Sequence, residues 1–206
     1  MNYDILLAFS VATFVLSLSP GPDNIFVLIQ SISNGKKQGL AVVAGLMSGC
    51  LVHTSLLAFG VSAIIKNNPT IFTGIKAFGA AYLLYLAILV YRGGDAIAIE
   101  GESKNKKSLG ALYKQGFIMN VLNPKVIIFF LAFFPGFLFS DSLSNVFQFY
   151  TLGLLFILVS SIVFSGIAIL SGQISTFIKT KEHTGFILKW VQIIVFIGIA
   201  IYLFFG

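Results

Sequence analysis

Two charged residues and one histidine fall well inside long apolar stretches of this 206-residue sequence: Asp23, Lys125 and His53. An unpaired charge at the centre of a bilayer costs at least about 2.5 to 3.5 kcal/mol on insertion scales, so such residues usually have a function. Asp23 can bind an ammonium group or carry a proton, and Lys125 can pair with Asp23 or with a carboxylate. Two structural alternatives stay open: Asp23 as a helix cap, and Lys125 as a side chain that extends to the membrane interface.

Both charged residues stand beside proline-centred interruptions of apolar segments. Residues 19–24 read Ser-Pro-Gly-Pro-Asp-Asn, and residues 120–125 read Asn-Val-Leu-Asn-Pro-Lys. Proline removes a hydrogen bond from a helix and frees a carbonyl, and in hydrocarbon such a break persists only where protein or water satisfies the backbone. We therefore predict two broken helices whose breaks face the interior of a bundle.

The histidine belongs to a face of small residues. Ala41, Gly45, Gly49 and His53 recur every four residues, so they share one side of a helix and allow a close backbone approach. His53 then points inward, where it is either a candidate proton relay or a neutral histidine bonded by a neighbouring helix. The face can pack within one chain or between protomers, so a homo-oligomer stays open.

Six apolar segments must position these residues. The chain is 57% hydrophobic and 10% charged, against about 25% charged in soluble proteins. Each segment approaches the 20 or so residues that a membrane-spanning helix needs, and the segments are continuously apolar rather than alternating as barrel strands are. The predicted fold class is an all-α integral membrane protein. Its six predicted transmembrane helices cover residues 5–31, 40–65, 71–91, 116–139, 146–171 and 186–205.

The two interruptions occupy corresponding places in the two halves of the chain. Pro20 and Pro124 are 104 residues apart (124 minus 20), and each break lies in the first helix of a set of three. Because three is odd, the second set enters the membrane from the opposite side. We predict one membrane transporter domain, 1–206, made of two inverted three-helix repeats, 1–91 and 116–206, joined by a cytoplasmic linker, 92–115. Paired broken helices of this kind point to a substrate site near the midplane of a secondary transporter.

The net charge of +6 is distributed as membrane orientation requires. Short loops on one side carry ten cations, against two on the other, so the positive-inside rule predicts that both termini lie outside the cytoplasm. This distribution favours topology over a nucleic-acid partner. The ten cations are Lys36, Lys37, Arg92, Lys104, Lys106, Lys107, Lys114, Lys179, Lys181 and Lys189, and the two are Lys66 and Lys76.

Several other classes of function fit the sequence poorly. The single cysteine, Cys50, excludes an intramolecular disulfide and a multi-thiolate metal site, and we expect no metal or cofactor. Ser48 lies outside any GxSxG motif and is five residues from His53, so the two side chains diverge by about 140° on one helix. We therefore expect no enzymatic activity. An ion channel or transporter, and a membrane scaffold that transports nothing, remain alternatives.

The order of these motifs resembles a known family. Residues 19–24, the stretch Asn-Gly-Lys-Lys-Gln-Gly-Leu at 34–40, and residues 45–53 together resemble the N-terminal signature of the LysE/RhtB family of amino-acid exporters. Residues 76–86 are similar to its third span. The stretch Gly-Phe-Ile-Met-Asn-Val-Leu-Asn-Pro-Lys at 116–125 is similar to its fourth. The resemblance covers nearly the whole chain.

The resemblance implies efflux of an amino acid or a related small metabolite across the bacterial cytoplasmic membrane, driven by protons through alternating access. Its implied partners are the amino-acid substrate, protons and membrane lipid. A zwitterion in a low-dielectric site needs an anion for its ammonium and donors for its carboxylate, which Asp23 and Lys125 can supply. We expect Asp23 and His53 to be the residues that couple transport to protons. The implied substrate-binding residues are Pro20, Gly21, Pro22, Asp23, Asn24, Asn120, Asn123, Pro124 and Lys125.

Overall fold

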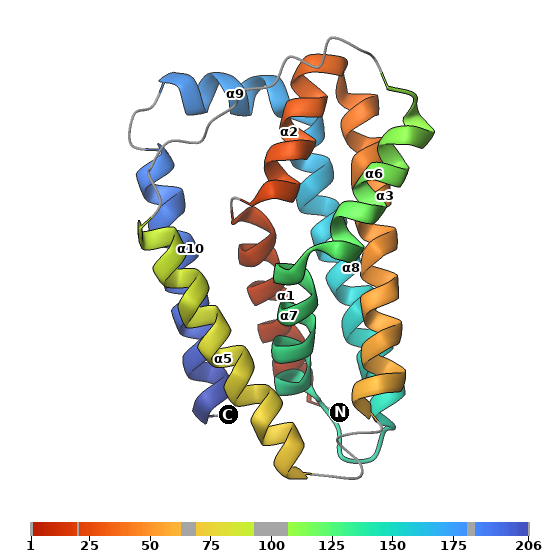
Figure 1. Ribbon diagram of the computed structural model, residues 1–206, viewed down its shortest axis with the longest axis vertical. Helices are drawn as coiled ribbons and strands as arrows, with labels where there is room; N and C mark the ends of the chain where they lie inside the picture. Colours follow the sequence, from red (N-terminus) through yellow and green to blue (C-terminus); the bar gives the residue numbers. More distant parts are fainter. Residues whose placement is uncertain (1, 20, 63–68, 93–106, 181–183, 206) are drawn as a thin grey trace.

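The computed structural model describes residues 2–19, 21–62, 69–92, 107–180 and 184–205, and within these ranges every regular element is a helix (Figure 1). The helices run mostly side by side along one axis, except α9, which lies across one end of the bundle. They are α1 (Tyr3–Leu18), α2 (Pro22–Asn34), α3 (Lys36–Leu56), the π-helical η1 (Leu57–Val61), α5 (Pro69–Arg92), α6 (Leu109–Leu122), α7 (Pro124–Phe133), the 3-10 helix η2 (Phe134–Phe137), α8 (Asn145–Ile169), α9 (Ser171–Thr180) and α10 (Thr184–Phe205).

Both predicted helix breaks are present. The α1–α2 pair bends by 57° and the α6–α7 pair by 53°. Helix α2 resumes at Pro22 and α7 at Pro124, where proline is tolerated because a first-turn N–H has no partner within the helix. At the far end of α2, Gly35 has a φ of 103° and joins α2 to α3 without an intervening loop. Only glycine adopts that backbone conformation without strain.

The apolar helices are those of a membrane protein. Among the described residues, α3 with η1 and α8 are each long and apolar enough to cross a membrane, and four segments qualify if each bent pair counts as one span. Helices α5 and α10 contain the shorter apolar stretches Ala77–Arg92 and Lys189–Tyr202. All six predicted segments coincide with helices, but their arrangement as two inverted repeats stays a prediction.

The helix that contains the fourth predicted span begins before that span. Helix α6 begins at Leu109, seven residues before the expected start of the span at Gly116, so the last part of the predicted linker, 109–115, is helical. The helix starts early because the Ser108 hydroxyl accepts a hydrogen bond from the Ala111 backbone N–H at 3.2 Å, which is an N-cap. The polar residues that follow it extend the helix beyond the apolar part. The rest of the predicted linker, 93–106, lies outside the described residues.

The small-residue face of α3 packs within the chain, against α6. A Cβ placed on Gly45 would overlap the backbone carbonyl of Tyr113, and one on Gly116 would overlap that of Val42. The two helices therefore touch backbone to backbone, as small residues allow in membranes. This contact accounts for the face without a second protomer, and homo-oligomerisation stays untested.

A cluster of phenylalanines holds α7 against α1. The ring of Phe9 lies 5.3 Å from that of Phe133, 5.1 Å from Phe134 and 5.4 Å from Phe137. All four side chains are buried. Ring pairs at these separations are stabilising beyond the apolar area they bury. The cluster thus fixes α1, which ends at the first break, beside α7 and η2, which follow the second break.

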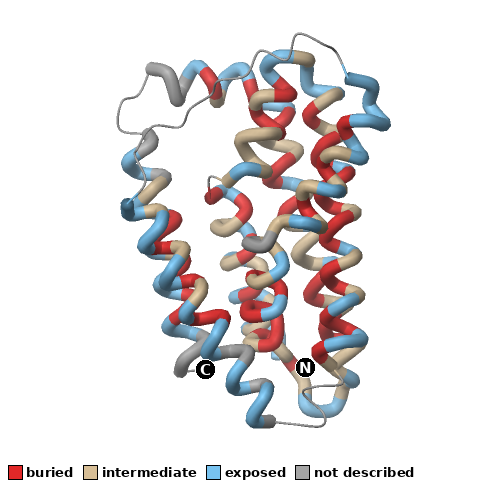
Figure 2. The backbone as a smooth tube through the Cα atoms, in the orientation of Figure 1, coloured by how far each residue is buried: buried red, intermediate tan, exposed pale blue. Residues whose placement is uncertain are grey.

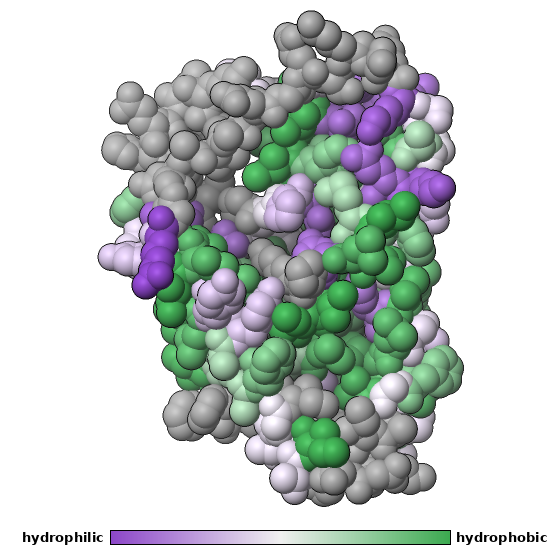
Figure 3. Space-filling view, viewed as in Figure 1, coloured by the Kyte–Doolittle hydropathy of each residue, from purple (hydrophilic) through white to green (hydrophobic). Residues whose placement is uncertain are grey.

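The surface of the bundle agrees with a membrane environment. Buried residues line the inner faces of the helices, and exposed ones face outward (Figure 2). Many exposed side chains are large and apolar, as on α8, where Leu154, Leu158 and Ile162 are each more than half exposed. Figure 3 shows such apolar surface over much of the visible face. Both termini lie at one end, whereas the α2–α3 turn with Lys36 and Lys37 lies at the other (Figure 1).

Candidate functional site

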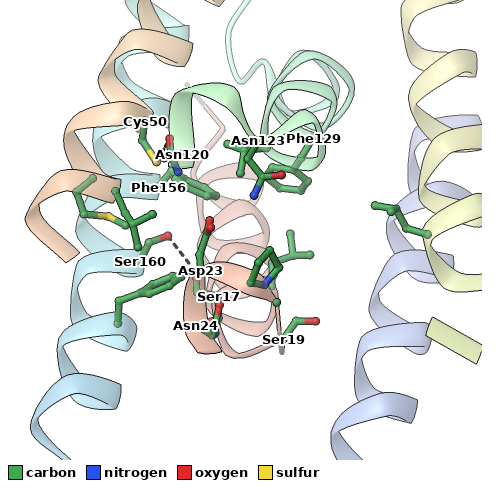
Figure 4. A pocket seen from close by; sticks show the side chains of 18 of the residues that line it. Ser17, Ser19, Asp23, Asn24, Cys50, Asn120, Asn123, Phe129, Phe156 and Ser160 are labelled. Carbon is green, nitrogen blue, oxygen red and sulfur yellow. Dashed lines mark hydrogen bonds between the residues drawn. The ribbon is translucent and has the colours of Figure 1, made fainter. Parts of the chain in front are cut away.

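A cavity of about 100 Å³ lies where the two helix breaks meet (Figure 4). The breaks form its polar part, and side chains from α3, α5, α7, α8 and α10 close it. The described polar lining consists of Ser17, Ser19, Gly21, Asp23, Asn24, Cys50, Asn120, Asn123 and Ser160. The apolar lining consists of Leu16, Pro22, Leu46, Met47, Leu83, Leu86, Val126, Phe129, Phe156, Phe164 and Phe196.

The first break is tied to the rest of the bundle through Ser17. The Asn24 side-chain amide donates a hydrogen bond to the Ser17 carbonyl at 2.7 Å, across the interruption. The Ser17 hydroxyl lies 2.9 Å from the hydroxyl of Ser160 on α8. Gly21 occupies the N-cap position of α2, so Asp23 is not the cap residue but lies in the first turn. A carboxylate there is stabilised by the helix dipole.

The second break is held by α3 through Asn120. In a continuous helix, the carbonyl of Asn120 would accept a hydrogen bond from residue 124, but Pro124 has no N–H. The carbonyl instead accepts from the Asn123 N–H at 3.1 Å and lies 3.2 Å from Nε2 of His53. Because a carbonyl only accepts, Nε2 carries the hydrogen. The Asn120 side-chain oxygen accepts from the Cys50 thiol at 3.7 Å.

The histidine bond gives a testable prediction. We expect His53→Leu to lower the stability of the folded protein by about 1 to 3 kcal/mol, because a buried carbonyl loses its donor. His53→Gln keeps an N–H donor and should stay close to the original protein. Thermal unfolding of detergent-solubilised variants measures the difference, and equal melting of the two variants would contradict the bond.

The structure brings most of the predicted binding residues to one place. Gly21, Pro22, Asp23, Asn24, Asn120 and Asn123 all line the cavity. Figure 4 shows the Asp23 side chain directed toward the end of α6, where Asn120 and Asn123 lie. Pro20 lies outside the described residues, as do the side chains of Pro124 and Lys125, although the backbone of both belongs to α7. His53 contacts Asn120 from α3 and is not part of the described lining.

Sequence reasoning missed other parts of the cavity. Ser17 and Ser160 are hydroxyl-bearing residues in apolar helices, a signal that was present in the sequence. The apolar walls gave no such signal, because Leu83, Phe156 and Phe196 resemble any other apolar residue of their helices. Among the described residues, no three His, Cys, Asp or Glu side chains gather as a metal site would require.

Bent apolar helices whose polar breaks line a central cavity define a membrane transporter as the class of protein. Comparison with known proteins agrees: the model of the LysE type translocator family matches residues 14–206. The chain belongs to this family, so the predicted resemblance is confirmed, and it is a multi-pass membrane protein.

Relatives from bacteria match along most of their length. The homoserine/homoserine lactone efflux protein of Salmonella typhimurium is 32% identical over 183 residues, which cover 89% of this chain and 88% of that protein. Its counterpart in Salmonella typhi is 33% identical with the same coverage. An uncharacterized membrane protein of Vibrio cholerae is 30% identical over 182 residues, or 88% of each chain. No solved structure matches the chain.

Proposed function

We propose that this protein is a secondary-active exporter of an amino acid or a related small metabolite in the bacterial cytoplasmic membrane, coupled to protons and working by alternating access. The observation that carries the proposal is the cavity between two polar helix breaks, with the carboxylate of Asp23 in its wall. Membership of a translocator family supports it, and so do relatives named for homoserine efflux.

The two breaks suit the two charged ends of an amino acid. Asp23 binds the cargo's ammonium group, and the first-turn N–H groups of α7, with Lys125, Asn120 and Asn123, bind its carboxylate. Lys125 follows Pro124 at the start of α7 as Asp23 follows Pro22 at the start of α2. Each half of the chain thus contributes one charge beside one helix start, so a zwitterion between them is neutralised at both ends.

The packing of the helices supports alternating access between two bodies. Helices α5 and α10 pack on each other as a pair, while α3 packs on α6 and α8, and α1 packs on α8. The predicted halves are therefore interleaved, and the α5–α10 pair, rather than one half, is the natural moving body. The α5–α10 pair contacts the other helices mainly through α7 and α1. Both half-helices lie toward the end that carries the termini (Figure 1).

The end of the bundle opposite the termini is less closed. Helix α2, beyond the first break, has no comparable packing with α5 or α10 among the described residues. Figure 3 shows the surface hollowed in this region. If the termini are outside, as the loop charges predict, this conformation exposes the cavity to the cytoplasm, where an exporter loads its cargo. Tilting the α5–α10 pair toward α2 and away from α7 would expose the cavity to the other side.

Proton coupling follows if Asp23 binds cargo and proton in turn. A carboxylate that pairs with an ammonium is not protonated at the same time, so release of cargo outside allows protonation there, and the protonated carrier returns. His53 is the second titratable residue near the breaks, through its contact with Asn120. Both roles are part of the proposal.

Excretion by intact cells tests the proposed function. Cells that overexpress the chain are fed a mixture of dipeptides, and amino acids in the medium are quantified by mass spectrometry against an empty-vector control. We expect one amino acid, or a small group, to accumulate faster outside cells that contain the chain. An unchanged profile with correctly inserted protein would contradict amino-acid export and favour ion transport or a scaffold role.

A further inference from the structure

We propose that one end of the α5–α10 pair binds the headgroup of an anionic phospholipid. The site is a cluster of basic and aromatic side chains at the point where α5 ends and α10 begins. This basic-aromatic cluster consists of Tyr91 and Arg92 from α5 with Phe186, Lys189 and Trp190 from α10. It is separate from the cavity, because the described lining of the cavity includes none of these residues.

Contacts between side chains hold the cluster together across the two helices. The centre of the Trp190 ring lies 6.2 Å from that of Tyr91, edge to face, and 6.2 Å from that of Phe186. The ammonium group of Lys189 lies 5.8 Å from the centre of the Tyr91 ring, which is a cation–π contact. This contact holds Lys189 beside the end of α5, where the next residue is Arg92.

The side chains of the cluster face outward. Tyr91 is 62% exposed, Phe186 50% and Trp190 40%, and the guanidinium-bearing Arg92 is exposed as well. Tryptophan and tyrosine favour the membrane–water interface, because each combines an apolar ring with a polar group that stays hydrated. Figure 3 shows strongly hydrophilic surface at the outer edge of this end of the pair, next to apolar surface. The cluster therefore fits the boundary between hydrocarbon and headgroups.

The charge of this end of the pair favours an anionic headgroup. Residues 88–95 and 179–190 contain four cations and two acids, a net charge of +2 (4 minus 2). The cations are Arg92, Lys179, Lys181 and Lys189, and the acids are Asp95 and Glu182, which lie outside the described residues. A guanidinium group binds phosphate oxygens through two parallel N–H donors, and an ammonium group adds a second positive charge. Arg92 and Lys189 supply one group of each kind.

The position of the cluster in the bundle agrees with this ligand. Helix α5 ends and α10 begins toward the end of the bundle that carries α9 and the α2–α3 turn, opposite the termini (Figure 1). The loop charges predict that this end faces the cytoplasm. The cytoplasmic leaflet is the one with a negative surface potential, and each Lys or Arg near it strengthens association by roughly fivefold.

Trp190 is the only tryptophan of the chain and provides the test. Quenching of its fluorescence reports which lipid lies beside the cluster, and this measurement needs no transport, so it is independent of the proposed function. The full-length protein is reconstituted in phosphatidylcholine vesicles with either brominated phosphatidylglycerol or brominated phosphatidylcholine. We expect the anionic lipid to bind beside Trp190 at least about fivefold more strongly than the neutral lipid.

Two of the possible results would overturn the proposal directly. Equal quenching by the two brominated lipids would mean that the cluster does not distinguish an anionic headgroup from a neutral one. Quenching by neither lipid would mean that protein, such as a second copy of the chain, covers Trp190.

Two double substitutions separate the cluster from the general attraction of a basic protein end. Arg92→Gln with Lys189→Gln removes both cations of the cluster and should abolish the preference for the anionic lipid. Lys36→Gln with Lys37→Gln removes as many exposed charges at the start of α3 and should retain it. Arg92→Gln alone leaves Lys189 beside Tyr91 and should lose part of the preference. A preference that survives the first double substitution, or falls equally in both, would overturn the proposal.

Discussion

Asp23→Asn is expected to reduce export by about 50-fold or more, the largest effect we predict for a single side chain. The substitution keeps the size of the side chain and one accepting oxygen, replaces the other oxygen by a donating amide group, and removes the only acid within the predicted transmembrane segments. Without it, the ammonium group of the cargo enters a low-dielectric cavity unpaired, at a cost of at least about 2.5 to 3.5 kcal/mol. Initial rates of efflux, normalised to the amount of inserted protein, measure the effect.

The matched control is Asp141→Asn, the same chemical change at an exposed loop position. It should leave efflux unchanged. Stability is a second control, since the loss of a first-turn carboxylate costs α2 only about 0.3 to 1 kcal/mol of dipole interaction. Efflux by Asp23→Asn at the original rate would remove Asp23 from the binding site and leave the exporter itself standing.

The helix breaks could be predicted from the sequence because their causes are local. Proline lacks an N–H wherever it stands, and a charge in an apolar segment is visible without any knowledge of packing. The prediction that both breaks face one interior is therefore matched by the cavity, which six of the predicted binding residues line. The wall could not be predicted, since it depends on which faces of α5, α8 and α10 turn inward. The hydrogen bond between the Ser17 and Ser160 hydroxyls also depends on packing, since it joins residues 143 positions apart.

The role of His53 shows a different limit. Its place on an inward-facing stripe was predictable from the four-residue spacing, and the structure buries it to 3% exposure. Its partner was not predictable, because the Asn120 carbonyl needs a donor only where Pro124 interrupts the neighbouring helix. The predicted bond of His53 to a neighbouring helix thus agrees with the structure. Its role in proton coupling stays a prediction.

The pairs of packed helices match the predicted repeat only in part, since the α5–α7 contact has no comparable α10–α2 counterpart among the described residues. Exchanging the halves replaces α3 by α8 and α6 by α1, so the α3–α6 contact becomes the α8–α1 contact, and both are present. The α5–α10 pair maps onto itself. The first half-helices end at Leu18 and Leu122, which are 104 residues apart (122 minus 18), and the second begin at Pro22 and Pro124, which are 102 apart (124 minus 22). The first break is therefore longer by two residues, and inverted symmetry stays a prediction.

The α3–α6 contact leads to the second large effect, on stability. Gly45→Ala or Gly116→Ala should each destabilise the protein by about 1 to 3 kcal/mol or more, because the added Cβ meets a backbone carbonyl that cannot rotate away. Helices α3 and α6 must then separate. Since α6 ends at the second break, export should fall as well.

Two other glycines provide the control for that experiment. Gly110 on α6 and Gly166 on α8 have open space where a Cβ would lie. Alanine there should be neutral or stabilising by about 0.4 to 1 kcal/mol, since it restricts only the unfolded chain. Thermal unfolding in detergent compares the four variants. If Gly45→Ala melted like Gly166→Ala, α3 and α6 would not be in backbone contact, and the Asn120 break would need another support than α3.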